Sequence, residues 1–330
     1  MILILSEKGD LSTNDIINWL CYFNYPFVRI NKDEPDKVEL FVESYPDSYD
    51  FYFKVGNKKF SLNQIQAYWY RRGGLPKCRI SNEAIQQAFE KEIIKDIEKY
   101  LIFESYMLYD FLYYILEKVP VTLGSEKYSD VNKLIVLDYA KECGLNVPDY
   151  SISMSKDKLN LFRQNITGSL ITKGIWEGLS VFVETSGYST YTEMLTNNDL
   201  NDLPNHFYPS LFQKNIHKKY ELRIFYLKGS FYSMAIFSQK NRQTQVDFRK
   251  YDDSKPNRNI PYQLPKDIEE KLHRLMNRLS LDTGSIDMIV DLENDFYFLE
   301  VNPVGQFGMT SLPCNYNLEK EIALILANKK

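Results

Sequence analysis

Two apolar segments near the end of the chain, SIDMIVDL and YFLEVN, have the alternating pattern of a β-hairpin. An even loop between them places Asp287 opposite Asn302, with Glu300 two positions back on the same face. That register gathers the apolar side chains on the other face: Met288, Val290, Leu292, Tyr297, Leu299 and Val301. The pattern therefore predicts a hairpin with one buried face and one face that carries oxygen-bearing side chains.

Asp287, Glu300 and Asn302 are predicted to form a metal site. Opposed Cβ atoms in a hairpin lie ~4.5–5.5 Å apart, so three oxygen ligands can converge on a hard cation. No His or Cys joins them, which favours Mg²⁺ or Mn²⁺ over zinc. The alternative is a solvated polar face on an edge hairpin. Ile289 and Phe298 share that face, and apolar groups there suit an adenine ring better than water.

Composition excludes several classes of protein. The chain has 330 residues, of which 44% are hydrophobic and 25% charged, as in ordinary globular proteins. A net charge of -4 gives no basic excess for a nucleic-acid partner. The start shows no signal peptide, no later segment is apolar enough for a membrane span, and the four cysteines form no C-x-x-C pair. We expect a cytoplasmic protein without a zinc site.

The first part of the chain predicts an α/β fold. A strand at ILIL precedes a helix that Ser12 or Thr13 would cap, and YPFVRI then forms a second strand. From Asn82 to about Lys118 the apolar residues recur at helical spacing. Tyr106, Tyr109, Tyr113 and Tyr114 add an aromatic side to this helix. It is either a core helix or a surface for a dimer partner or a peptide.

The second part of the chain contains the candidate phosphate-binding residues. It lacks the glycine patterns of P-loop and Rossmann proteins, so phosphates would need basic side chains. Lys133 lies near the start of a helix that Asp130 is predicted to cap, and Lys173 lies in an apolar strand beside Gly174. Arg223 and Arg249 are two more candidates. Each could instead pair with a structural carboxylate, such as Glu221 or Asp247.

Taken together, these segments resemble those of ATP-grasp ligases of the RimK-like branch. The order of the Lys133 helix, the Lys173 strand, FQKNI, ELR, VDFR, GSIDMIVD and FLEVNPVGQF is similar to theirs. AYWYRRGG and LEVNPVGQF further resemble the microviridin-type, or graspetide, synthetases, nearest the grasp-with-spasm peptide maturases. The resemblance implies an ATP-grasp fold with an N-terminal domain at 1–120, a central subdomain at 121–212 and a C-terminal subdomain at 213–330.

The resemblance also implies roles for individual residues. Lys133 and Lys173 would contact the phosphates of ATP, and Asp287, Glu300 and Asn302 would hold Mg²⁺. Arg223 and Arg249 would lie by the transferring phosphoryl group and the substrate carboxylate. The adenine would be bound by the linker strand and a packing residue: Gln213, Lys214, Asn215, Ile216 and Ile289. Lys214 departs from the acidic residue that related ligases often have at this position.

The implied reaction is ATP-dependent macrocyclisation of a precursor peptide. An Asp or Glu side chain of the peptide becomes an acylphosphate, which a Ser or Thr hydroxyl or a Lys amine then attacks; we expect esters. The resemblance further implies leader-peptide binding and a homodimer. One alternative is a RimK-like ligase that adds an amino acid to a protein or small molecule. Another is a non-catalytic, nucleotide-sensing peptide-binding scaffold, although such a scaffold has no need of all three metal ligands.

Overall fold

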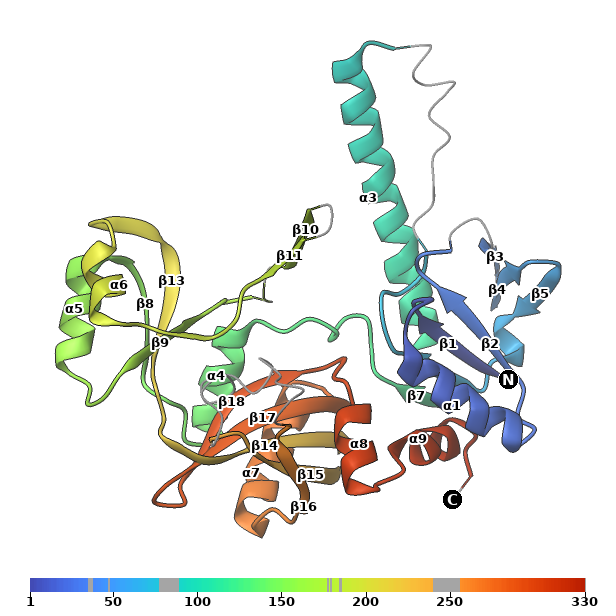
Figure 1. Cartoon of the computed structure of the whole chain (residues 1–330). Helices are drawn as coiled ribbons and strands as arrows, with labels where there is room; N and C mark the ends of the chain where they lie inside the picture. Colours follow the sequence, from blue (N-terminus) through green and yellow to red (C-terminus); the bar gives the residue numbers. More distant parts are fainter. Residues whose placement is uncertain are drawn as a thin grey trace. The chain divides into compact units, whose positions relative to one another are not determined.

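The computed structural model describes residues 1–34, 38–46, 48–76, 89–176, 178, 180–183, 186–239 and 256–329 (Figure 1). The chain folds as two compact units. Unit 1 comprises Met1–Ser129 and Asn317–Lys330, and unit 2 comprises Asp130–Tyr316. The subdomain boundaries at 121 and 213 remain predictions.

Unit 1 is built on a parallel sheet in the order β2-β1-β6-β7. Its central strand β1 is buried at every position, as expected for a parallel strand covered on both faces. The predicted strand–helix–strand order is confirmed. The strands are β1 (Ile2–Ser6), β2 (Phe27–Asn31), β6 (Ala67–Tyr70) and β7 (Val121–Leu123).

The helices of unit 1 differ in how far they are buried. Helix α1 (Leu11–Tyr22) buries Thr13, Ile16 and Leu20, and it packs against α9 (Leu318–Leu326). Its N-cap is Asp10, so the prediction that Ser12 or Thr13 caps it was wrong. Helix α3 (Lys91–Leu116) buries residues only in its last two turns, from Tyr109 onward.

A second sheet in unit 1 is antiparallel and has the order β3-β4-β5. It is followed by a short 3-10 helix, η2, in which the Ser61 and Gln64 side chains form a capping box. The elements are β3 (Val38–Tyr45), β4 (Ser48–Val55), β5 (Lys58–Ser61) and η2 (Leu62–Gln64).

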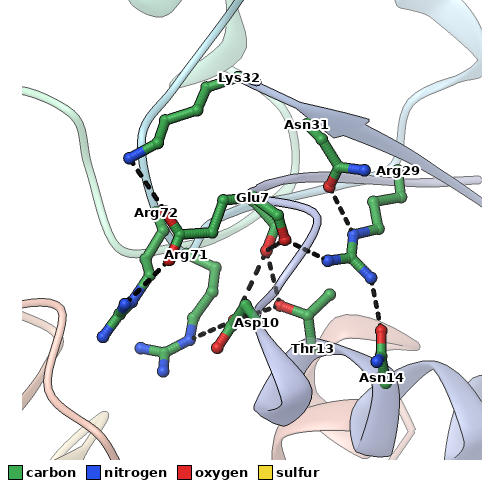
Figure 2. Close-up of polar contacts among 10 residues, drawn as sticks. Glu7, Asp10, Thr13, Asn14, Arg29, Asn31, Lys32, Arg71 and Arg72 are labelled. Atoms are coloured by element: carbon green, nitrogen blue, oxygen red, sulfur yellow. Dashed lines mark hydrogen bonds and ion pairs between the residues drawn. The ribbon is translucent and has the colours of Figure 1, made fainter. Parts of the chain in front are cut away.

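Charged side chains cluster where the parallel strands of unit 1 end (Figure 2). Arg71 Nε donates to Asp10 Oδ2 at 3.1 Å, and both side chains are buried. Glu7 lies nearer the surface, between Lys32 Nζ and Arg72 Nη1, each at 3.0 Å. Burial alone would raise the pKa of Glu7, but its hydrogen bonds to Lys32 and Arg72 outweigh this and hold the pKa below its usual value. The cluster fixes the start of α1 to the ends of β1, β2 and β6.

Unit 2 begins with helix α4 (Lys133–Glu142) and a four-stranded sheet in the order β12-β9-β13-β8. Helix α5 covers one face of this sheet, over a core of Leu159, Leu170, Leu200 and Phe212. The elements are β8 (Tyr150–Ser155), α5 (Lys156–Gln164), β9 (Leu170–Lys173), β12 (Glu193–Met194), α6 (Asn197–Asp202) and β13 (His206–Lys214). A separate hairpin is formed by β10 (Ser180–Val183) and β11 (Ser186–Ser189).

The second sheet of unit 2 is antiparallel, in the order β16-β15-β14-β17-β18. Lys228 and Gly229 form the turn between β14 and β15, and both residues have positive φ angles. Helix α7 spans Lys266–Arg278 and buries Ile268, Leu272, Leu275 and Met276. The elements are β14 (Lys218–Leu227), β15 (Ser230–Phe237), β16 (Arg258–Tyr262), β17 (Thr283–Asp291), β18 (Phe296–Asn302) and α8 (Gly308–Cys314).

The predicted α/β class is confirmed, since both units combine sheets with covering helices. Within the described residues, no helix has the length and apolarity that crossing a bilayer requires.

Candidate functional site

A cleft in unit 2 lies between the two sheets and contains most of the predicted site residues. One wall comes from β9 and β13, and the other from β14, β17 and β18. Nine predicted residues line it: Lys133, Lys173, Gln213, Lys214, Asn215, Ile216, Asp287, Ile289 and Glu300. The cleft therefore brings together residues from five separate parts of the sequence.

The register of the β17–β18 hairpin differs from our prediction. Asp287 pairs with Glu300, and Asn302 pairs with Ser285, so Asp287 is not opposite Asn302. The cause is a β-bulge between Asp287 and Met288, which inserts one extra residue into β18. Relative to the prediction, the pairing shifts by two residues beside Asp287 and by three residues nearer the turn. An even shift keeps a side chain on its face, so Asp287, Glu300 and Asn302 still share one.

The odd shift nearer the turn exchanges the faces of two apolar residues. Phe298, predicted on the ligand face, is fully buried in the core, and Leu299, predicted in the core, lines the cleft instead. Leu292, also predicted in the core, is exposed. Of the six residues assigned to the apolar face, Met288, Val290 and Val301 are buried.

Two basic side chains contact the paired carboxylates. Arg223 Nη1 donates to Asp287 Oδ1 at 2.8 Å and to Oδ2 at 2.7 Å. Lys133 Nζ lies 3.3 Å from Glu300 Oε2. Arg223 thus pairs across the sheet with a cleft carboxylate, and not with Glu221, which was its alternative partner. Arg223 and Lys133 thus place positive charge beside the carboxylates of Asp287 and Glu300, and this charge offsets the repulsion between them.

Lys133 is placed by the first turn of α4. The helix is capped by Asn132, whose side chain accepts hydrogen bonds from the backbone N–H groups of Leu134 and Ile135. The predicted cap, Asp130, lies outside the helix and accepts a hydrogen bond from Trp176 Nε1 at 3.3 Å. Lys133 is consequently the first residue of the helix, where backbone N–H groups and the helix dipole also favour anions.

Gln213 is the most deeply buried of the predicted linker residues, at 1% exposure. Neither the oxygen nor the nitrogen of its side-chain amide has a hydrogen-bond partner in the described part of the chain. A buried amide without partners is costly, so its presence at the cleft indicates that a polar ligand group satisfies it. The family resemblance had placed Gln213 in the adenine-binding linker without a role for its side chain.

A buried ion pair in the cleft was missed by the sequence analysis. Lys218 Nζ and Glu221 Oε1 form a salt bridge, and Ser238 Oγ donates to Glu221 Oε2 at 3.3 Å. Both charged residues line the cleft. Their signal was a lysine and a glutamate three residues apart at the start of a mostly apolar strand.

Two of the remaining predicted residues, Asn302 and Arg223, do not line the cleft. Asn302 is exposed at the end of β18, and Arg223 contacts Asp287 without being a lining residue of the cleft. Arg249 lies outside the residues that the structure describes.

The donor set fits a magnesium ion better than a preformed metal cage. Among the residues described, no three His, Cys, Asp or Glu side chains come together to hold a metal. Asp287 and Glu300 are directly opposed, and Asn302 follows on the same face. Magnesium is typically bound by one or two carboxylates together with water and substrate phosphates, so this smaller set suits it.

Comparisons with known proteins agree with this geometry. No protein-family model matches the chain, and a search of curated proteins found no match either. Solved structures do match over the full length. A RiPP-associated ATP-grasp ligase from Chryseobacterium gregarium, in complex with ADP and a leader and core peptide, is 25% identical with a TM-score of 0.80. The match covers 100% of this chain and 97% of that one.

A second similar structure is the macrocyclase MdnC from Microcystis aeruginosa, bound with the precursor peptide MdnA. It is 26% identical with a TM-score of 0.77, and the match covers 99% of each chain. The N5-carboxyaminoimidazole synthetase from Staphylococcus aureus is only 11% identical, with a TM-score of 0.55, over 100% of this chain and 77% of that one. That likeness shows the fold alone.

The cleft between two sheets and the full-length likeness to these enzymes lead to one conclusion. The chain is an ADP-forming ATP-grasp ligase, and it is similar over its full length to RiPP-associated ATP-grasp ligases and peptide macrocyclases.

Proposed function

We propose that the protein closes rings in a ribosomally made precursor peptide, joining Asp or Glu side chains to Ser or Thr hydroxyls as esters. The observation that carries the proposal is the full-length likeness to two enzymes solved with their peptides. The cleft supports it, because paired carboxylates and two lysines from different elements line one cavity. We place the reaction in the cytoplasm, where ATP and the precursor are available.

In this proposal each wall of the cleft binds a different part of ATP. Lys133 and Lys173 neutralise its phosphates. The base lies along Gln213–Ile216, packs on Ile289, and satisfies the side-chain amide of Gln213. A glutamine amide offers both a donor and an acceptor, which matches the amino group and N7 of adenine. The same amide would place its oxygen against an acceptor of guanine, so we infer that it contributes to selection of ATP.

Asp287, Glu300 and Asn302 would hold Mg²⁺, which offsets the charge of the phosphates during transfer. Arg223 donates hydrogen bonds to Asp287. In this proposal it would orient that carboxylate and lie beside the transferring phosphoryl group. Arg249 would bind the substrate carboxylate, as the family resemblance implies.

In the proposed reaction, two bonds between heavy atoms form and two break for each ring. A carboxylate oxygen of the peptide attacks the γ-phosphorus of ATP, the bond to the β-phosphate oxygen breaks, and ADP leaves. A hydroxyl oxygen of the same peptide then attacks the acyl carbon, loses its proton, and phosphate leaves. Since both groups belong to one peptide, the second step gains the proximity of an intramolecular reaction.

The mass of the peptide product tests this proposal. The precursor would be encoded beside the gene, with clusters of Thr or Ser and of Asp or Glu. With ATP and magnesium, we expect the peptide to lose the mass of one water for each ring, and mild base to restore it because esters hydrolyse readily. A reaction without ATP is the control. A gain in mass with a supplied amino acid would instead identify the RimK-like activity, and no ADP release would favour the scaffold.

The turn after β18 offers a second test of the site. A Cβ atom on Gly305 would lie 2.1 Å from Ser285 Oγ and 2.6 Å from Ser285 N, and Ser285 is the residue that pairs with Asn302. We expect Gly305→Ala to displace the turn, to cost about 1–3 kcal/mol of stability, and to lower ATP turnover by roughly 10–100-fold. Thermal unfolding and ADP release measure the two effects.

Gly308→Ala is the matched control, because no atom of the residues that the structure describes lies within 4 Å of a Cβ atom at that position. It should leave both quantities near those of the wild type. If Gly305→Ala also behaved like the wild type, the close packing of Gly305 against Ser285 would have no role in shaping the site.

We also propose that the protein is a homodimer, as the family resemblance implies.

A further inference from the structure

A hydrogen bond at the rim of the cleft joins two segments that are far apart in the sequence. Trp176 Nε1 donates to Asp130 Oδ2 at 3.3 Å. Trp176 lines the cleft, yet its side chain is 66% exposed. Tryptophan side chains are mostly buried in folded proteins, and an exposed one contributes little to a core. Packing therefore does not account for Trp176 at this position.

The two partners belong to opposite walls of the cleft. Trp176 follows β9, a strand of the sheet that also contains β13. Asp130 precedes α4, which packs against β18 of the second sheet (Figure 1). The hydrogen bond therefore connects one wall of the cleft to the other.

Each partner also lies close in sequence to a lysine that we assign to the phosphates of ATP. Trp176 is three residues after Lys173, and Asp130 is three residues before Lys133. Both lysines line the cleft. Lysine side chains are flexible, so the separation of the two ammonium groups depends on where their backbone segments are held. A tryptophan side chain is rigid and has few rotatable bonds, which makes it suited to holding them.

We propose that Asp130 and Trp176 form a strap that holds the two walls of the cleft together around the phosphates and sets the separation of Lys133 and Lys173. They are positioning residues, because they act through the two lysines. The bond is longer than the ~2.9 Å of a typical N–H···O bond, so the walls have room to approach around a nucleotide. This inference rests on the proposed assignment of the cleft to ATP.

The charge of Asp130 separates the strap from a simple electrostatic effect. A carboxylate near the phosphates repels them, so charge alone predicts that replacing Asp130 by Ala strengthens nucleotide binding. The strap predicts that the same substitution weakens it. Asn132 caps α4, so the loss of the Asp130 side chain leaves the start of the helix and the place of Lys133 in it intact.

A double-mutant cycle tests the strap by isothermal titration of the full-length protein with magnesium and a non-hydrolysable ATP analogue. Asp130→Ala removes the acceptor, and Trp176→Phe removes the donor but keeps an aromatic ring. We expect each to weaken binding about 3–10-fold, and the double variant to bind no more weakly than either, because all three lack the same bond. Asp130→Asn keeps an acceptor oxygen and should restore most of the affinity.

Asp267→Ala and Trp19→Phe are the matched controls, because Asp267 is an exposed residue of α7 and Trp19 belongs to α1 of unit 1. Both should bind the analogue like the wild type. Losses that add up in the double variant, or tighter binding by Asp130→Ala, would overturn the strap and leave the nucleotide site standing. No binding by the wild type would refute the assignment of the cleft to ATP, and the strap with it.

Tryptophan fluorescence gives a second test of the same bond. The chain has three tryptophans; Trp69 is 2% exposed and Trp19 is partly buried, so Trp176 should account for most of the emission that acrylamide quenches. We expect a saturating concentration of the analogue to protect this emission in the wild type, and to protect it less in Asp130→Ala. Equal protection in the two proteins would mean that Trp176 is held at the cleft without Asp130, and would contradict the strap.

Discussion

Replacing Asp287 by Asn is expected to remove most ATP turnover, by at least 100-fold, and to leave binding of the leader peptide nearly unchanged. Asp287 pairs with Glu300 across the hairpin and binds Arg223 Nη1 through both of its oxygens. The substitution keeps the size of the side chain but removes one of the two opposed carboxylates that would hold Mg²⁺. Loss of one charge-stabilising group commonly costs 10²–10³ in rate, and here it also weakens binding of the metal.

Stability must be measured together with turnover, because Asp287→Asn would leave the buried Arg223 guanidinium without its negative partner on β17. Some loss of folding free energy is therefore expected. Assays should run below the unfolding temperature of the variant. Three measurements separate loss of a metal ligand from loss of the fold: ADP release, isothermal titration with magnesium and nucleotide, and affinity for the leader peptide. Loss of a metal ligand lowers the first two and leaves the third unchanged, whereas unfolding lowers all three.

Asp267→Asn is the matched control for this substitution. Asp267 is an exposed residue of α7 that pairs with Lys271 at 3.4 Å, so its replacement should change neither turnover nor stability measurably. ADP production at the wild-type rate by Asp287→Asn would refute the assignment of Asp287 to the metal.

The shared face of Asp287, Glu300 and Asn302 was predictable from sequence, but the register of the hairpin was not. Alternation specifies faces with a period of two, so a shift of two residues leaves the pattern of polar and apolar positions unchanged. Phe298 and Leu299 are both apolar, and no sequence signal distinguishes the one that enters the core from the one displaced by the bulge. The bulge therefore became visible only in the structure.

The partners of charged residues were the other feature that sequence alone did not determine. Lys173 was identified because a charge in an apolar strand needs a purpose, and it does line the cleft. Arg223 met the same criterion, but its partner Asp287 lies on β17, far along the chain, and only the pairing of β14 with β17 brings the two together. The Lys218–Glu221 pair was missed because a lysine and a glutamate three residues apart usually form an exposed pair.

The largest effect on stability is expected in unit 1, at the buried ion pair between Asp10 and Arg71. Asp10 Oδ2 accepts hydrogen bonds from Arg71 Nε at 3.1 Å and from Thr13 Oγ1 at 2.6 Å (Figure 2). Burial lowers the pKa of Arg71, and the nearby Asp10 charge opposes that effect. Because removing one partner leaves the other charge buried, each single substitution, Asp10→Asn or Arg71→Met, should cost about 3–5 kcal/mol.

The double variant should lose much less than the sum of the two single losses, because it leaves no buried charge behind. Arg72→Met is the neighbouring control. Arg72 pairs with Glu7 at 3.0 Å, but both side chains are partly exposed, so the loss should stay within about 1 kcal/mol. Urea unfolding followed by circular dichroism and tryptophan fluorescence gives the four free energies. Additive losses in the double variant would mean that Asp10 and Arg71 stabilise unit 1 through separate contacts. Equal losses for Arg71→Met and Arg72→Met would mean that burial does not increase the free energy lost when an arginine is removed from this cluster.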